Sequence, residues 1–264
     1  MKNQLRKCTA IDTATERTAR RGAWRVLLFA ALLVFGNAAW AAQVAGVVAR
    51  LSGPLLAKKA DGSVKVLGPK SEVESGDTLV AEKNTYAQIR FVDNSEITLR
   101  PGTTFRIENF AYDEGKPEAD QASYSLVKGG LRSITGLMGK RNKEKFSLKT
   151  PNATIGIRGT TFIAQYVAPE PASAQAAPAL APGLHVSVSE GAIVVTNEGG
   201  ALGFQAGQFG YVPNPNQPPV IVPADPGLRF VPPPAFDAGP GAGGPPAGPG
   251  PGEGQGSAVD CVVR

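Results

Sequence analysis

The chain has 264 residues and a formal net charge of +5, but its basicity belongs to the first 41 residues. Seven of the 27 lysines and arginines and two of the 22 acidic residues precede Ala42, which leaves 20 of each sign after it. A neutral main part lacks the basic domain that nucleic-acid binding requires, so we expect no nucleic-acid partner. One histidine and two cysteines are also too few for a zinc site or Ser-His catalysis, and we expect neither a metal nor a cofactor.

Residues 1–41 have the pattern of a signal peptide. Several arginines precede an apolar run over residues 26–35, and the small residues of Ala39-Trp40-Ala41 fit cleavage after Ala41. The run is shorter than the ~20 residues that cross a bilayer. We therefore expect a periplasmic or secreted protein, which contacts a membrane only if this segment stays uncleaved.

Residues 42–212 show short apolar alternations separated by Gly, Pro, Asp and Asn, which predicts an all-β domain. In residues 87–91, for example, Ala87, Ile89 and Phe91 share one face of a half-buried strand. Short strands with regular turns favour either a β-helix-like stack or a sandwich, and periodicity does not give the strand order.

Two segments have compositions that oppose packing. Residues 168–183 are rich in Ala and Pro, and we expect a flexible insert between strands that end near Val167 and begin near Leu184. Residues 213–264 are rich in Pro and Gly, which predicts a disordered tail. Cys261 lies in this tail and is the one cysteine left after cleavage, so we expect no intramolecular disulfide.

The most informative stretch is residues 150–162, which read TPNATIGIRGTTF. Pro151 can start a strand but cannot continue one, and glycines allow a bulge or a close approach of two backbones. The stretch resembles the core motif of the FecR domain, and further motifs of that family follow its order from about residue 47 to residue 212. The motif residues implied by the resemblance are Gly76, Asp77, Pro151, Gly156, Arg158, Gly159, Thr160 and Gly191.

The FecR domain is the envelope-side module of bacterial iron-responsive regulators, and the resemblance favours the β-helix-like arrangement. It implies sensing or protein contact in the envelope and does not imply iron binding. The regulators also carry a cytoplasmic helical domain that holds a sigma factor. The segment before Val26 is too short for that domain, so we do not expect direct sigma-factor regulation.

Three groups of polar residues are candidate sites. Arg158 stands in an apolar strand pattern, so we expect it to be partly buried and bonded to turn carbonyls or to a carboxylate such as Asp77 or Asp93, with ligand contact as the alternative. His185 reads as an ordinary, partly exposed strand residue. A basic loop over residues 140–145 is either a solvated surface or a docking patch for an acidic partner or anionic polymer. Its candidate partner-surface residues are Lys140, Arg141, Lys143 and Lys145.

Acidic residues cluster around Gly115 without the spacing of a calcium loop. These residues are Asp113, Glu114, Glu118 and Asp120. Such acids normally face water, so we do not expect a hydrolase.

The sequence therefore predicts a non-enzymatic exported binding module of the bacterial envelope that contacts an unknown envelope protein or cell-wall polymer. The alternative is a structural or surface-adhesion protein whose Pro/Gly tail spaces its β domain from the envelope.

Overall fold

The computed structural model describes residues 43–169, 180–228 and 230–236. The predicted signal peptide, the middle of the insert and the end of the tail lie outside these ranges. No helix within the described ranges is long and apolar enough to cross a membrane.

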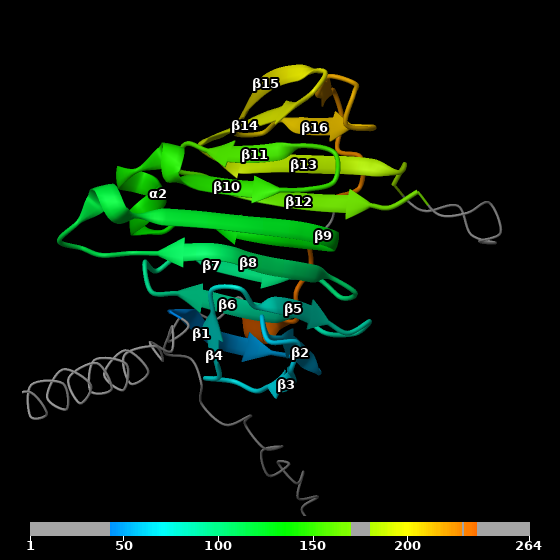
Figure 1. Ribbon diagram of the computed structural model, residues 1–264. Helices are drawn as coiled ribbons and strands as arrows, with labels where there is room; N and C mark the ends of the chain where they lie inside the picture. The colour runs from blue at the N-terminus through cyan, green and yellow to red at the C-terminus, as the bar shows by residue number, and fades with distance from the viewer. Residues whose placement is uncertain (1–42, 170–179, 229, 237–264) are drawn as a thin grey trace, which may run out of the picture. The chain divides into compact units, whose positions relative to one another are not determined.

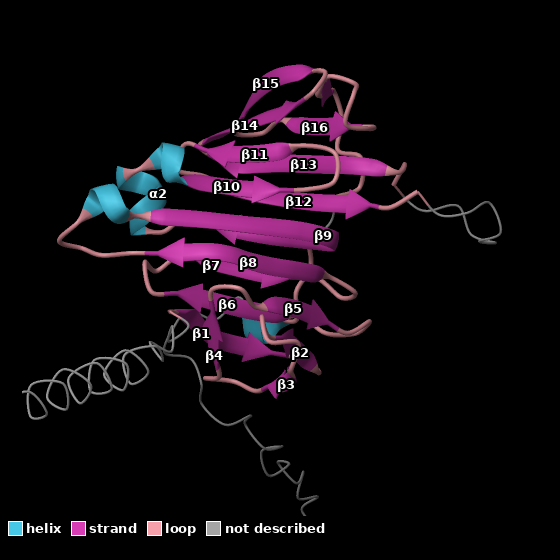
Figure 2. Ribbon diagram, in the orientation of Figure 1, coloured by secondary structure: helices cyan, strands magenta, loops and turns pink. Residues whose placement is uncertain are grey.

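The described residues form two β-sheets, and the prediction of an all-β fold is confirmed (Figures 1 and 2). Sheet A has the spatial order β4 (Glu72–Glu74), β1 (Val44–Leu51), β6 (Ala87–Phe91), β7 (Glu96–Leu99), the end of β9 (Gln121–Ile134), β12 (Thr161–Val167), β13 (Gly183–Glu190), β16 (Phe209–Val212) and β17 (Val220–Val222). Sheet B has the order β3 (Val64–Leu67), β2 (Leu55–Lys58), β5 (Thr78–Ala81), β8 (Thr104–Ala111), the start of β9, β10 (Phe146–Lys149), β11 (Thr154–Ile157), β14 (Ala192–Asn197) and β15 (Gly200–Gln205).

The chain passes repeatedly from one sheet to the other, so the fold combines features of a β-helix and a sandwich. β9 belongs to both sheets, because its first half pairs with β8 and its last residues pair with β7 and β12. The change of sheet occurs at Gly129, whose φ of +87° suits glycine. A methyl group there would lie 2.7 Å from the Cα of Thr103. Neighbouring strands are antiparallel except β9 and β10, which are parallel.

The hydrophobic core lies between the sheets. The predicted inner face of β6 is confirmed, since Ala87, Ile89 and Phe91 are all buried, but the strand is more than half-buried because Gln88 on its other face is only 5% exposed. The ring of Phe91 in sheet A lies 5.1 Å from that of Phe110 in sheet B and 5.3 Å from that of Tyr124. Burial raises the pKa of Tyr124 well above its usual value. Aromatic contacts across the core therefore join the two layers.

The predicted boundary of the tail at residue 213 is wrong, because ordered structure continues to residue 236. β17 pairs with β16, and residues 223–228 and 230–236, here called the C-terminal strap, return to the beginning of the domain. The rings of Phe230 and Phe236 each lie 6.2 Å from that of Tyr86, and Arg50 donates a hydrogen bond to the carbonyl of Phe236. Aromatic burial outweighs the Pro/Gly composition in this segment.

Replacing Phe236 with alanine should release the end of the C-terminal strap, because its ring is 8% exposed against Tyr86. We expect the free energy of unfolding, measured with urea, to fall by about 2 kcal/mol, and hydrogen exchange in the C-terminal strap to become faster. Val231→Ala is the control, since Val231 is 71% exposed and should change stability by less than ~0.5 kcal/mol. Equal effects of the two substitutions would contradict this role of Phe236.

Candidate functional site: the turn edge

Four of the eight motif residues, Arg158, Gly159, Thr160 and Gly191, lie where several strand connections meet at one end of the sheets. We call this region the turn edge. It comprises the β6–β7 turn (93–95), residues 135–136 after β9, the β11–β12 turn (158–160), the β13–β14 turn (190–191) and the β15–β16 turn (206–208). The short helices α2 (Leu137–Arg141) and η2 (Lys143–Lys145) lie beside it at the left of Figure 1.

Thr160 is the central residue of the turn edge. Its side chain is 3% exposed, and Oγ1 donates a 2.6 Å hydrogen bond to the carbonyl of Ala192. Oγ1 also accepts a bond from the backbone N–H of Arg158, at 3.2 Å. The hydroxyl of Thr135 donates to the Thr160 carbonyl at 2.7 Å and accepts from its N–H at 2.9 Å. One threonine thus links three connections that are far apart in sequence.

Two motif glycines allow these connections to touch. Gly159 and Gly191 have φ values of +69° and +75°, in the left-handed region that glycine adopts readily. A methyl group on Gly191 would overlap the carbonyl oxygen of Gly159 and lie 3.1 Å from the Cα of Thr160. The β15–β16 turn also contacts these connections, since Ala206 donates its N–H to the carbonyl of Gly191 at 3.0 Å.

The β6–β7 turn joins the same edge through Asp93. Its buried carboxylate accepts hydrogen bonds from the N–H and the hydroxyl of Ser95, and Asn94 adopts a φ of +60°. The Asp93 carbonyl accepts a 2.8 Å bond from the N–H of Leu137, which starts α2. Close packing against Gly136 leaves no room for a side chain there.

Gly76 and Asp77 have a related structural role between β4 and β5. Asp77 is 1% exposed and accepts bonds from Lys59 Nζ at 2.8 Å and from the Glu74 N–H at 2.9 Å. The pKa of Lys59 is raised overall: burial opposes the rise, and its bonds to Asp77 and Glu74 outweigh that effect. Gly76, with φ +93°, donates its N–H to the carbonyl of Ile107.

The other two motif residues lie away from this contact network. Pro151 is exposed in the turn between β10 and β11. Beside it, buried Asn152 donates two 3.0 Å bonds to the carbonyls of Val212 and Pro213. Gly156 lies within β11, where a methyl group would come no closer than 3.9 Å to the Val194 carbonyl. Of the two features that glycines in this stretch allow, a bulge or a close backbone approach, the close approach does not occur at Gly156.

The predicted burial of Arg158 is wrong. Strand β11 ends at Ile157, so Arg158 belongs to the turn and its side chain is exposed. In the described part of the chain its guanidinium has no hydrogen bond or ion pair. The two expected carboxylates have other partners, since Asp77 binds Lys59 and Asp93 binds Ser95.

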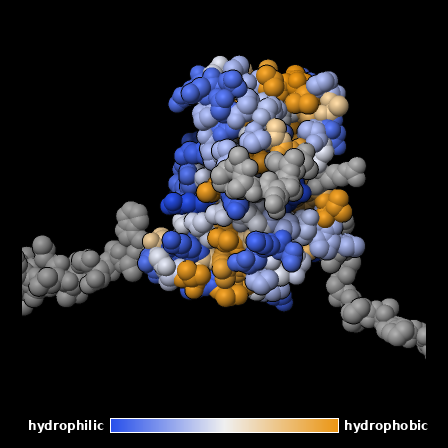
Figure 3. Space-filling model, turned by 90° about the vertical axis from the view of Figure 1, so that its right-hand side faces the viewer, coloured by the Kyte–Doolittle hydropathy of each residue, from blue (hydrophilic) through white to orange (hydrophobic). Residues whose placement is uncertain are grey.

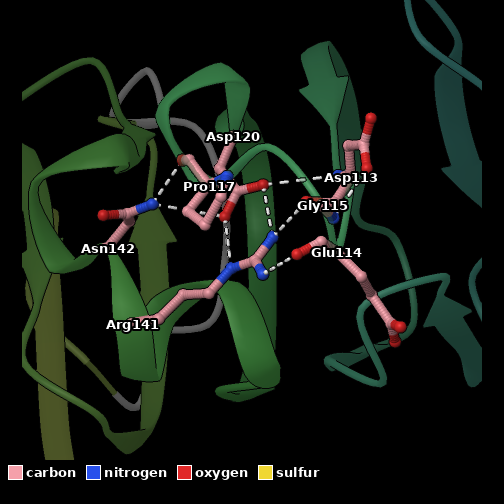
Figure 4. A network of polar contacts seen from close by, with 7 residues as sticks. All are labelled: Asp113, Glu114, Gly115, Pro117, Asp120, Arg141 and Asn142. Atoms are coloured by element: carbon pink, nitrogen blue, oxygen red, sulfur yellow. Dashed lines mark hydrogen bonds and ion pairs between the residues drawn. The ribbon is translucent and has the colours of Figure 1, made fainter.

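The acidic and basic segments are joined by Arg141 (Figure 4). Its Nε and Nη2 donate 2.8 Å bonds to the two carboxylate oxygens of Asp120, which is 1% exposed. The guanidinium also donates to the carbonyls of Asp113 and Glu114 and lies 4.6 Å from the ring centre of Tyr112. Its hydrogen bonds to Asp120 lower the pKa of that carboxyl.

Arg141 is therefore a structural residue and is withdrawn from the predicted partner surface. The segment expected to be a loop is helical over α2 and η2. Lys140, Lys143 and Lys145 are exposed, and none forms a salt bridge with another described residue. Glu144 lies between Lys143 and Lys145, so the surface carries mixed charge.

His185 is buried, contrary to the prediction of partial exposure. It is 4% exposed, stacks on Tyr211 with ring centres 4.7 Å apart, and its Nε2 lies 2.8 Å from the Ala181 carbonyl. Burial lowers its pKa. The Tyr211 hydroxyl donates to the Pro182 carbonyl, so the last residues of the predicted flexible insert are fixed on sheet A. The flanking strands end and begin at Val167 and Gly183, close to the predicted positions.

The contacts of Thr135 and Asp120 were missed by sequence reasoning. Their partners lie 25 and 21 residues further along the chain, and no local pattern indicates such pairs. Within the described ranges, no group of three His, Cys, Asp or Glu residues could hold a metal ion.

Comparison with known proteins gives one family match. Residues 77–194 match the model of the FecR protein family, which covers the centre of the predicted range. No curated protein matches the chain.

Two crystal structures of a candidate anti-sigma factor from Parabacteroides distasonis ATCC 8503 are similar at 16% identity and a TM-score of 0.40. The similarity covers 55% of this chain and 58% of that chain, so this chain spans less than two thirds of its length. A cell surface anchoring domain matches at 19% identity and a TM-score of 0.23, over 24% of this chain and 82% of that one. Likeness at these scores carries no conclusion about function.

Gly191→Ala should destabilise the domain strongly, because the new methyl group would overlap the Gly159 carbonyl. Gly207→Ala is a matched control, since Gly207 has a similar φ of +82° and open space around it. We expect Gly207→Ala to lower the free energy of unfolding by about 1 kcal/mol through backbone strain, and Gly191→Ala to lower it by about 2 kcal/mol more, as measured by chemical unfolding. Equal losses would show that the two turns do not touch.

Arg141→Met should loosen residues 113–120, because it leaves the Asp120 carboxylate buried without its cation. The folded protein lowers the pKa of Asp120 below its ordinary value of 3.8, so this pair stabilises the fold above that pH and the contribution is lost as pH falls. Arg141→Met should therefore destabilise the protein more at pH 7 than at pH 3. Lys140→Met, which removes an exposed neighbouring cation, should leave hydrogen exchange in residues 113–120 unchanged. A pH-independent effect of Arg141→Met would contradict the role of Asp120.

Proposed function

Residues 77–194 match the FecR protein family, and on that basis we propose that this chain is a non-enzymatic binding module of the bacterial cell envelope. In this proposal residues 1–41 direct export, and the turn edge contacts another envelope protein. The observation that carries the proposal is the position of Arg158. Its neighbours in the motif hold the turns together, whereas its own side chain is exposed and has no partner among the described residues.

The fixed backbone around Arg158 is suited to recognition of a protein partner. Its backbone N–H is fixed by bonds to Ala192 and Thr160, so binding would cost little backbone entropy. Leu137, which is 43% exposed, begins α2, and α2 packs on Ile157 next to Arg158. Arginine is enriched among the few residues that carry most of the energy of a protein interface. The expected partner therefore presents a carboxylate that Arg158 can bind.

The test is cross-linking in intact cells with tagged full-length protein, followed by mass spectrometry of the captured envelope proteins. We expect one envelope protein to be captured reproducibly, and its recovery to fall about tenfold or more with Arg158→Glu. Lys83→Glu has the same charge change at an exposed turn remote from the motif and should not reduce capture.

Two results would overturn the proposal. Unchanged capture by Arg158→Glu would exclude Arg158 as the contact. Recovery of wall material alone would favour the structural or adhesion role. Fractionation of the same cells tests export, because the proposal requires the chain in the periplasm or the medium.

A further inference from the structure

The outer face of sheet B carries a regular row of cations and hydroxyl groups. Paired residues continue across seven strands, from β2 to β14, each directly opposite the next. In spatial order the row is Lys58, Thr78, Arg106, Ser125, Lys149, Thr154 and Thr196. The row joins residues that are up to 138 positions apart in the sequence, so only the fold reveals it.

The side chains of this row point away from the core. The next residues along the same strands, such as Ala57, Phe105 and Leu148, are buried at 0 to 1% exposure. Successive side chains of a strand alternate between its two faces, which places the row on the outside. Lys58, Arg106, Lys149, Thr154 and Thr196 are all exposed. The C-terminal strap contacts Arg50 and Tyr86 on the side of sheet A, and in Figure 1 it passes behind the stack.

The cations occupy every second strand. Lys58, Arg106 and Lys149 lie on β2, β8 and β10, and hydroxyl residues on β5 and β9 separate them. Neighbouring strands are ~4.8 Å apart, so the cations repeat roughly every 9.6 Å. Glu108 contacts Lys149 at 3.0 Å, but with Lys149 55% exposed this pair is weak and can exchange for another anion.

We propose that this row binds an extended anionic polysaccharide with an acidic group on every second sugar. A sugar unit of an extended glycan advances by about the spacing of two neighbouring strands. Alternate sugars would then place their carboxylates at Lys58, Arg106 and Lys149. The hydroxyls of Thr78, Ser125, Thr154 and Thr196 lie between and beyond the cations, where they can hydrogen-bond to the sugar hydroxyls.

Two features favour this ligand over others. The row has no aromatic side chain on which the bases of a single-stranded nucleic acid could stack, and the main part of the chain has no excess positive charge. Figure 3, which views the protein from the right-hand side of Figure 1, shows several apolar areas separated by hydrophilic ones on that side. Binding at the row is independent of the proposed protein contact, because Arg158 lies on the turn edge.

The test is affinity measurement with purified full chain at low and physiological salt. Hyaluronan, which has one carboxylate on alternate sugars, is the probe. Polygalacturonate, with a carboxylate on every sugar, neutral dextran and single-stranded DNA are the comparisons. We expect hyaluronan to bind at least as tightly as polygalacturonate despite its lower charge density, dextran not to bind, and added salt to weaken binding.

The triple variant Lys58→Gln, Arg106→Gln and Lys149→Gln should lose about tenfold in hyaluronan affinity. A matched control removes the same charge from three exposed turn or loop residues with Lys70→Gln, Lys83→Gln and Lys116→Gln. The control should bind normally, and circular dichroism will show that both variants fold.

A register variant tests the spacing separately from the charge. Exchanging the opposed pair with Thr78→Arg and Arg106→Thr moves one cation by one strand at constant net charge. We expect this variant to lose hyaluronan affinity several-fold but to keep its affinity for polygalacturonate. The inference would be overturned if hyaluronan did not bind, if DNA bound equally well, or if affinity followed charge density alone. It would also be overturned if either the triple variant or the register variant kept its full affinity for hyaluronan. None of these results would bear on Arg158 or on export.

Discussion

The packing of the strand connections depends on the buried hydroxyl of Thr160. It bonds to the β13–β14 connection and to its own turn, while the adjacent backbone bonds to Thr135 after β9. A buried acceptor left without its donor costs about 1–3 kcal/mol, so each connection constrains the others. Because β9 ends and β12 begins in sheet A, whereas β11 ends and β14 begins in sheet B, these bonds also join the two sheets at this edge.

Buried carboxylates provide a second set of constraints. Asp120 and Asp77 are both 1% exposed, and each is neutralised by a cation from a distant segment, Arg141 and Lys59 respectively. A buried ion pair adds little net stability compared with apolar residues, but removal of one partner is costly. The main effect of such pairs is therefore to fix the position of a loop, and their net contribution to the free energy of unfolding is small. Charges that have no such role, including Arg158 and the cations of sheet B, remain available for partners.

Local patterns predicted the strands well and the long-range features poorly. The buried face of residues 87–91, for example, follows from alternation among neighbouring residues and was predicted correctly. The burial of Arg158 was misjudged because the apolar pattern continues to Ile157, whereas Gly159 already turns the chain. The C-terminal strap was missed because Pro and Gly dominate its composition, although Phe230 and Phe236 were a signal for docking. Cross-strand rows depend on register, which a single sequence does not specify.

The outer side of sheet A, the turn edge and the outer face of sheet B differ in how far contacts within the fold already occupy them. The side of sheet A is partly occupied by the C-terminal strap, so Gln88, which faces outward on β6, is only 5% exposed. The turn edge is held rigidly by Thr160 and its neighbours, and only individual side chains such as Arg158 project from it. The outer face of sheet B has exposed cations at regular intervals. Each central strand beneath them is paired with a neighbouring strand on both sides. A rigid edge suits a point contact with a protein, and a periodic face suits a periodic ligand. The two proposed contacts use different residues, so the proposals allow one domain to bind both kinds of partner at once.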